Sequence, residues 1–312
     1  MFLGFGSTWI VVAAAALMVC GAWIMLRPVT TDRLEHVGTF EWEAETINGL
    51  SGLEVSDDGL VFHAVTDRGW YLSGRFERVD GRIARILLDM LLPILGNDGL
   101  PVAARRVGDW SDAEGLAMAP DGTYWISFER WAHVSHYTAP DMAGQWIEDH
   151  PSFRDYDDNR QLEALALHPG GSLYAFPEQP LRPGFPIYRL TPGGWSIDGH
   201  IAPDDGFAIT GADFAADGRL YLLERRLFLG FWWQNRVRRL RIETPREVET
   251  LWTGRPGEYN NLEGLAVWPA QDGLRLTMVS DNNRKRGEAT QFVEFRLAPE
   301  PGGGRSDDMA RN

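Results

Sequence analysis

Ala113 to Arg130 reads AEGLAMAPDGTYWISFER, and four other stretches of the chain repeat its pattern in altered form. Each copy has a small residue followed by an apolar one, an Asp-Gly or Gly-Gly pair, a second apolar run and then an acid. The other copies are SGLEVSDDGLVFHAVTDR (Ser51–Arg68), LEALALHPGGSLYAFPEQ (Leu162–Gln179), TGADFAADGRLYLLERR (Thr210–Arg226) and LEGLAVWPAQDGLRLTMVSDNN (Leu262–Asn283). Two alternating apolar runs around such a turn predict a β-hairpin in every copy.

The spacing of the copies indicates how the hairpins are assembled. Counting from Gly52 through Gly115, Ala164 and Gly211 to Gly264, successive copies are 63, 49, 47 and 53 residues apart. Blades of β-propellers repeat at a similar interval, about 40 to 50 residues. We therefore predict an all-β protein with a five-bladed β-propeller over residues 36–298. A sixth, degenerate blade in residues 68–112 and a β-sandwich with a coincidental run of hairpins are the alternatives.

The strand-like stretch His36–Trp42 (HVGTFEW) lies outside the repeats. We predict that it pairs with Gln291–Leu297 (QFVEFRL), so that both ends of the domain complete one blade and leave no open edge. Two further apolar stretches have an ambiguous period. For Ile83–Leu95 we favour a core strand over a surface element that contacts lipid. We interpret Leu227–Trp233 as part of a strand, although aromatic residues beside arginines are also typical of a membrane interface.

Residues 9–26 form an apolar stretch of 18, close to the roughly 20 needed to span a bilayer. No basic residue precedes the stretch, and Trp23 to Leu26 follow its small residues, so an uncleaved hydrophobic helix is favoured over a signal peptide. We assign residues 1–28 to this membrane anchor, with the propeller at the cell envelope on the periplasmic side. Arg27 and Arg33, which follow the apolar stretch, instead favour the cytoplasmic side for the propeller. At the other end of the chain, residues 299–312 are predicted to be disordered.

Composition excludes several classes of function. A net charge of −14 with a single lysine would repel nucleic acid. Cys20, the only cysteine, lies in the apolar leader, so the domain has neither a disulfide nor a cysteine nucleophile. The chain also lacks the Gly-x-Ser-x-Gly, His-Glu-x-x-His, P-loop and Rossmann patterns.

Acidic residues recur at both ends of the hairpins. The two ends of a hairpin lie side by side opposite its turn, so a ring of hairpins should gather these acids at one mouth of the central channel. Glu114, Glu163 and Glu263 stand at the starts; Asp67, Glu129, Glu178, Glu224 and Asp281 stand at the ends. Crowded carboxylates need counter-charges or protons. Arginines could supply some, and Ca²⁺, which prefers carboxylate and amide oxygens, could supply the rest.

These considerations define the candidate site. The predicted metal ligands are Glu114, Glu163, Glu263, Asp281, Asn282, Asn261, Asp67, Glu129 and Glu178. The predicted ligand-binding residues are Arg68, Arg130, Arg225 and Asn159, and the predicted catalytic residues are Glu163, Glu114 and His133. In the alternative interpretation, the acids only cap strand ends and bind backbone amides of the next blade.

Four segments of the chain together resemble the bacterial phytase-like proteins, a family described by the phrase “esterase-like activity of phytase”. The segments are SGLEV…VTDRG, AEGLAMAPDGTYWISFER, LEALAL and VSDNN. The resemblance runs from about Ile47 to Leu297. It implies an exported β-propeller with phosphoesterase or esterase activity and Ca²⁺ at the channel mouth. The Glu-Gly opening is also similar to that of metal-dependent lactonases built on propellers, which adds lactones to the candidate substrates. Phytate itself would be repelled by an acidic mouth unless several cations were bound.

We therefore expect a monomeric, calcium-dependent hydrolase of a small ester, lactone or phosphoester, anchored to the membrane through residues 9–26. The rival hypothesis is a non-catalytic propeller that binds a ligand or a protein at its mouth, since fold alone does not establish catalysis.

Overall fold

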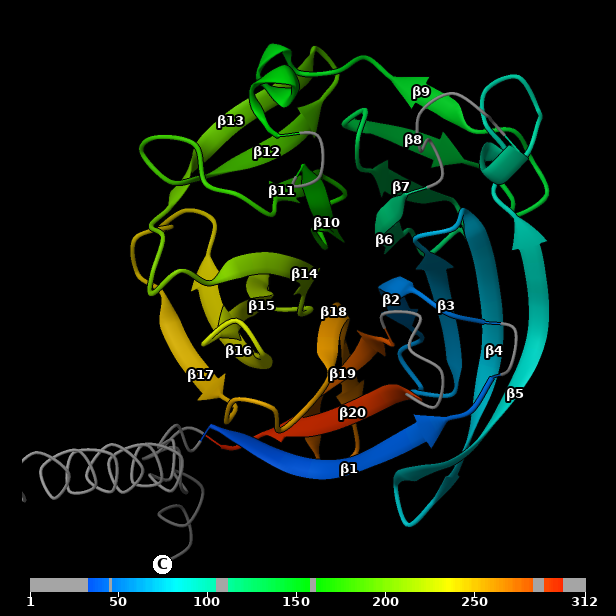
Figure 1. The fold of residues 1–312 in the computed structure, drawn as a ribbon, viewed down its shortest axis with the longest axis vertical. Helices are drawn as coiled ribbons and strands as arrows, with labels where there is room; N and C mark the ends of the chain where they lie inside the picture. Colours follow the sequence, from blue (N-terminus) through cyan, green and yellow to red (C-terminus); the bar gives the residue numbers. More distant parts are fainter. Residues whose placement is uncertain (1–32, 45–46, 105–111, 158–160, 283–288, 300–312) are drawn as a thin grey trace, which may run out of the picture.

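The computed structural model describes residues 33–44, 47–104, 112–157, 161–282 and 289–299. In this part of the chain, five four-stranded antiparallel sheets stand around a common axis as the blades of a propeller (Figure 1). The prediction of five blades is confirmed, and the six-bladed and β-sandwich alternatives are wrong.

The blades follow one another along the chain, each running from the axis outward. The first contains β2 (Leu50–Val55), β3 (Val61–Thr66), β4 (Trp70–Val79) and β5 (Arg82–Pro93); the second contains β6 (Ala113–Met118), β7 (Tyr124–Phe128), β8 (His133–Tyr137) and β9 (Gln145–Ile147). The third contains β10 (Leu162–Leu167), β11 (Leu173–Pro177), β12 (Phe185–Thr191) and β13 (Gly194–Ile201). The fourth contains β14 (Ala208–Phe214), β15 (Arg219–Phe228), β16 (Trp232–Arg241) and β17 (Glu249–Thr253). The fifth contains β18 (Asn261–Ala270), β19 (Gly273–Asp281), β20 (Thr290–Leu297) and β1 (Leu34–Trp42), and the short 3₁₀ helices η1 (Val102–Ala104) and η2 (Pro151–Asp155) lie in connections.

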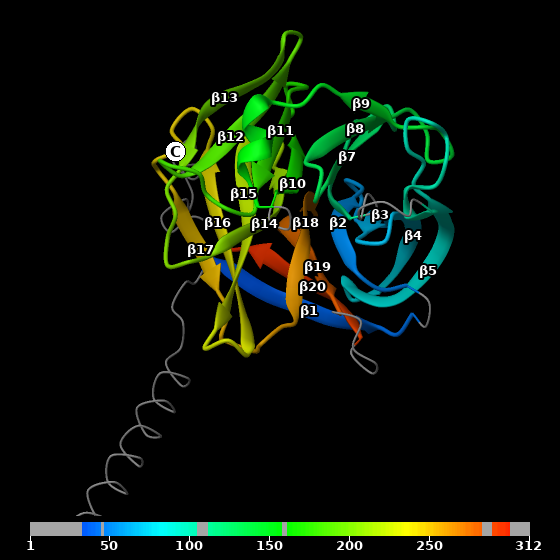
Figure 2. The same cartoon turned by 45° about the horizontal axis from the view of Figure 1, so that its top comes forward.

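The ring closes through the N-terminal strand, as the sequence predicts. β1 pairs antiparallel with β20 from Trp42 opposite Thr290 to Leu34 opposite Leu297. Figures 1 and 2 show β1 beside β20 at the outer edge of the fifth blade. Because residues from both ends of the domain share one sheet, neither end can separate without breaking that blade's hydrogen bonds.

The small residue in each repeat allows the blades to meet at the axis. A Cβ at Gly52 would lie 2.6 Å from the backbone nitrogen of Leu116 in the second blade. A Cβ at Gly264 in the fifth blade would lie 2.2 Å from the carbonyl oxygen of Ser51 in the first. Neighbouring inner strands therefore approach too closely for a larger side chain at most of these positions.

Hydrophobic clusters fill the spaces between blades. Between the first and fifth blades, the Phe62 ring stacks on Phe76 at 4.8 Å and meets Phe292 edge-on at 5.6 Å. An ion pair of 2.7 Å between Arg78 and Glu294 joins the same two blades. The twisted sheets thus face one another through packed side chains, as in other sheet-on-sheet packings.

The two ambiguous apolar stretches are both strands, but neither is a simple core strand. β5 is the outermost strand of its blade; its Leu88, Met90 and Leu91 are exposed, whereas Ile83 and Ile86 pack against the core and Ile94 is buried, so the expected core position holds for only part of the stretch. The other stretch forms the tip of the β15–β16 hairpin, where Phe231 is 80 % exposed.

Within the described residues, no helix is both long and apolar enough to cross a membrane. The predicted anchor in residues 1–28 and nearly all of the predicted C-terminal tail, residues 300–312, lie outside the residues that the structure describes.

Candidate active site

A β-bulge at the start of each inner strand positions the first set of site residues. In β10, Leu162 is opposite Pro177 and Ala164 is opposite Phe176, so Glu163 is the extra residue. The inner strands of the other blades shift register at the equivalent place. Bulges re-aim a side chain out of the regular alternation. The residues at these positions are Ser51, Glu114, Glu163, Thr210 and Glu263, and we call them the inner ring.

A second set comes from the ends of the second strands. The backbone nitrogens of Asp67, Glu129 and Glu178 donate to Gly49, Asp112 and Gln161, which precede the inner strands of their blades. The corresponding pairs in the other two blades are Ala208 with Arg225 and Asn261 with Asp281. We call the second-strand members the outer ring: Asp67, Glu129, Glu178, Arg225 and Asp281.

The prediction of an acid at this place in every copy is wrong for the fourth blade. There the outer-ring position is held by Arg225, whereas Glu224 is opposite Ile209, one residue further along the strand. Successive strand residues point to opposite faces, so Glu224 points away from the mouth. It is fully buried and accepts hydrogen bonds from Arg236 and Arg238 of β16.

Carboxylates of the two rings form two compact groups. Possible ligand oxygens of Asp112, Glu114 and Glu129 all lie within 4.8 Å of one another, and so do those of Glu129, Glu163 and Glu178. Glu129 belongs to both groups. The structure therefore brings together residues from the second and third blades that are as much as 66 positions apart in the sequence, from Asp112 to Glu178.

Arg225 neutralises the opposite side of the mouth. Its guanidinium donates to Glu263, to the Asn261 amide oxygen at 2.7 Å and to Glu178 at 3.2 Å, and it lies 3.8 Å from Glu163. Asn261 in turn donates to Glu263 at 2.7 Å, and Ser51 donates to the other Glu263 oxygen at 3.3 Å. The Glu263 carboxylate is therefore held by three donors from three blades.

The electrostatics of the mouth favour protons or cations. Burial, followed by the charges of Asp112 and Glu178, raises the pKa of Glu129 to about 8. The pKa values of Glu114 and Glu163 are also raised well above normal, first by burial and then by neighbouring carboxylates. Burial raises the pKa of Glu263 to about 7 although the Arg225 charge opposes it. Burial lowers the pKa of Arg225, but Glu263, Glu163 and Glu178 more than offset this effect, so the guanidinium stays charged.

The inner strands leave little space where they meet at the axis. The cavity lined there by Glu114, Glu163, Thr210, Glu263 and the residues that follow them has a volume of about 10 Å³. That volume is at the lower limit for one water molecule. A cavity of this size does not admit a substrate.

The remaining predicted residues are distributed differently. Asn282 is buried and donates to Asn48 at 2.7 Å, while Arg130 pairs with Asp112 at 3.1 Å and so joins the edge of the first carboxylate group. Arg68 is exposed on the turn that follows Asp67. Asn159 lies outside the described residues.

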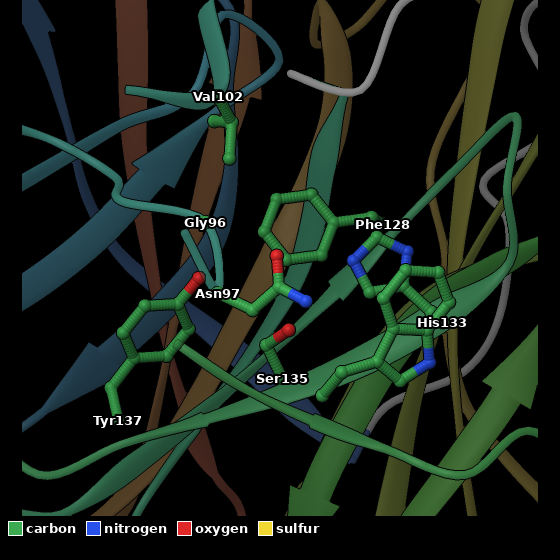
Figure 3. Close-up of a pocket in the computed structure, with 8 residues that line it drawn as sticks. Gly96, Asn97, Val102, Phe128, His133, Ser135 and Tyr137 are labelled. Carbon is green, nitrogen blue, oxygen red and sulfur yellow. The ribbon is translucent and has the colours of Figure 1, made fainter. Parts of the chain in front are cut away.

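His133 occupies a separate place in the second blade. Its ring stacks on Phe128 at 4.5 Å and on Trp146 at 4.4 Å, and its Nδ1 lies 2.6 Å from the Trp131 carbonyl oxygen. Figure 3 shows it with Phe128, Ser135 and Tyr137 around a cavity of about 20 Å³, which is too small for a substrate. We therefore leave His133 out of the proposed chemistry.

Asp112 is the site residue that sequence reasoning missed. It lies just before the second repeat and therefore outside the motif that was compared. The hairpin pattern could have indicated it, because the residue that pairs with a strand-end acid across a hairpin lies at the same rim as that acid.

The donor set fits a hard divalent cation. Each group offers three carboxylates, the ligand type that Ca²⁺ prefers, and their mutual repulsion leaves them short of positive charge. A cation of this kind would be held by Asp112, Glu114 and Glu129, or by Glu129, Glu163 and Glu178.

A family model described as phytase-like, with esterase-like activity of phytase, matches residues 45–284. No curated protein matches the chain. Among solved structures, virginiamycin B lyase from Staphylococcus aureus is 13 % identical over 85 % of this chain and 100 % of its own, with a TM-score of 0.45. The aldose sugar dehydrogenase of Streptomyces coelicolor is 15 % identical over 87 % of this chain and 100 % of its own, with a TM-score of 0.49. A protein of unknown function from Dyadobacter fermentans is 10 % identical over 86 % of this chain and 100 % of its own, with a TM-score of 0.49.

Proposed function

The chain belongs to the phytase-like family, whose description is “esterase-like activity of phytase”, and on this basis we propose that it is a cation-dependent hydrolase of phosphoesters, carboxylic esters or lactones. The observation that carries the proposal is the pair of carboxylate groups that share Glu129 at the mouth. Calcium is the cation we propose, because the donors are carboxylates with amide groups nearby.

The cation would polarise the ester or phosphoryl oxygen and neutralise the charge that develops on it. Asp112, Glu114 and Glu129 would hold it, with Arg130 orienting Asp112 through their 3.1 Å ion pair. Arg225 keeps Glu263 and Glu178 in place on the other side of the mouth.

Glu163 is the residue we assign to proton transfer. It belongs to the inner ring, is buried, and has its pKa raised by burial, then by Glu178 and Glu129. A carboxylate with a raised pKa accepts and returns protons more readily near neutral pH. Glu163 would take a proton from water as the water oxygen bonds to the carbonyl carbon or phosphorus. The bond to the leaving oxygen then breaks, and that oxygen receives the proton.

The test compares Glu163→Gln with the wild-type protein on 4-nitrophenyl acetate, 4-nitrophenyl phosphate and a simple lactone, each with added Ca²⁺. We expect wild-type turnover of at least one ester class and a loss of at least about 100-fold in kcat for the variant, the lower end of a general acid–base contribution. Glu77→Gln is the matched control, since Glu77 is exposed on β4 in the first blade and pairs with Arg85 at 3.5 Å. Equal turnover in both variants would overturn the assignment of proton transfer to Glu163, and no turnover of any ester class would overturn the proposed hydrolase in favour of a binding propeller.

A further inference from the structure

A cavity of about 390 Å³ lies between the second and third blades. Its walls include Trp131, Trp146, Phe153, Tyr156, Arg130 and Arg154. The volume is in the range of small-molecule sites, about 300 to 1,000 Å³. A cavity of about 400 Å³ between β1 and β5 has none of these residues and no member of either ring.

The cavity adjoins the first carboxylate group. Arg130 lines the cavity, and its Nε lies 3.1 Å from the Asp112 carboxylate. Gln161 lines it too, and its backbone nitrogen donates to Glu129 at 3.3 Å. Arg130 and Gln161 therefore border both the cavity and the first carboxylate group, so a ligand in the cavity lies beside these carboxylates.

The cavity walls present aromatic carbon, because their polar atoms already have partners. The Trp146 indole nitrogen donates to Asp149 at 2.9 Å, and the Tyr156 hydroxyl lies 2.9 Å from that of Tyr188. Phe153 is held edge-on against Tyr188 at 5.0 Å. Three of the four aromatic walls are therefore fixed by their own contacts before any ligand arrives, which lowers the entropic cost of binding.

Two tryptophans of the cavity wall reach solvent. Trp131 is 57 % exposed and Trp146 is 38 % exposed, which is high for tryptophan. Arg154 and Asp149 both line the cavity and attract each other, and Arg130 pairs with Asp112 at the edge of the cavity, so each arginine of the wall has an acid beside it. Gln161 is 95 % buried, and its side-chain oxygen has no hydrogen-bond partner in the described part of the chain.

We infer that this cavity binds the aromatic portion of an ester substrate, whose ester group then lies at the carboxylates of the mouth. The inference rests on the proposed function for the placement of the ester, and it names the substrate class as aryl esters or aryl phosphoesters. Stacking on tryptophan and tyrosine would select the ring.

The test measures binding without chemistry, using phenylphosphonate and methylphosphonate, which contain no ester bond. Calorimetry with the full chain, with and without Ca²⁺, should show the phenyl compound binding at least 10-fold more tightly than the methyl one. Trp131→Ala should reduce this ratio to below 3-fold. Trp232→Ala is the matched control, because Trp232 is similarly exposed but lies at the tip of the β15–β16 hairpin.

A ratio near one in the wild-type protein, or a ratio that survives Trp131→Ala, would overturn the inference. Since Trp131 is largely exposed, its removal leaves the core of the blade intact. The two proposals fail separately. A high ratio without any ester turnover would leave an aryl-anion binding site on a non-catalytic propeller, and turnover without a phenyl preference would leave a hydrolase with another specificity.

Discussion

Arg225 of the fourth blade donates a hydrogen bond to Glu263 of the fifth, and it stands where each of the other four blades has an acid. One guanidinium thus takes the place of a carboxylate in the outer ring and neutralises its neighbours. The mouth is divided as a result. Arg225 is the counter-charge for Glu263 of the fifth blade and also for Glu178 and Glu163 of the second carboxylate group, whereas Asp112 of the first group pairs with Arg130.

Replacing Arg225 with Met should destabilise the protein by about 3 kcal/mol, because it leaves buried carboxylates without their partner. Ca²⁺ should restore more stability to this variant than to the wild type, since the cation can replace the lost charge. Thermal unfolding in chelator and in millimolar Ca²⁺ measures both effects. The control is Arg296→Met, which removes a surface pair with Glu35. An unchanged response to Ca²⁺ would contradict the counter-charge role.

Replacing Glu129 with Gln should weaken cation binding more than replacing Glu178, because Glu129 belongs to both carboxylate groups and Glu178 to one. We expect at least a 10-fold increase in Kd for Glu129→Gln, and a smaller change for Glu178→Gln. Calcium titration followed by calorimetry is the measurement. Equal effects of the two variants would show that the groups do not share a ligand.

Replacing Gly264 with Ala should cost at least about 2 kcal/mol of unfolding free energy, since the added methyl group would overlap the Ser51 carbonyl at the junction of the first and fifth blades. Gly193→Ala is the control: it has an ordinary backbone conformation, and its nearest atom would be 3.8 Å away. Urea unfolding of both variants tests the expectation. Wild-type stability of Gly264→Ala would mean that the inner strands can separate.

A pH effect is expected from Asp213, which lies at the turn end of β14 and binds the backbone nitrogen of Val267 in the next blade at 2.6 Å. Burial raises the pKa of Asp213 to about 7, while backbone hydrogen bonds oppose the shift and Asp57 adds to it. Burial and Asp213 likewise raise the pKa of Glu54, which binds the Met118 nitrogen at 3.0 Å. The folded state therefore keeps protons that the unfolded state releases.

The sign of the effect follows from linkage. Between about pH 4 and pH 7 the folded protein binds more protons at Asp213, so this residue's contribution to stability is present at low pH and is lost as pH rises. The slope is at most about 1.4 kcal/mol per pH unit for one proton. Asp213→Asn should be less stable at pH 4 and should lose less stability than the wild type between pH 4 and 8 in urea unfolding. Parallel pH profiles would contradict this assignment.

Local sequence was sufficient to determine the hairpins, their turns and the closing strand. Gly122 and Gly171 have positive φ values of 87° and 86° at the predicted turns, and β1 lies where the alternation of HVGTFEW placed it. These features depend on backbone preferences and on two-residue alternation, both of which can be read from neighbouring residues. The small residue in each repeat was also visible, although its reason, the approach of the next blade, was not.

Only the tertiary structure decided which charged residues meet. Glu224 and Arg225 are adjacent in the sequence, and a one-residue difference in strand register exchanges the buried side chain with the one at the mouth. That register is set by the bulge at Thr210 and by the packing of Leu223 in the core, and neither can be read from the segment itself. The same holds for Asp112 and for the cavity at Trp131 and Trp146, because their surroundings come from separate segments that only the packing of the second blade and its connection to the third brings together.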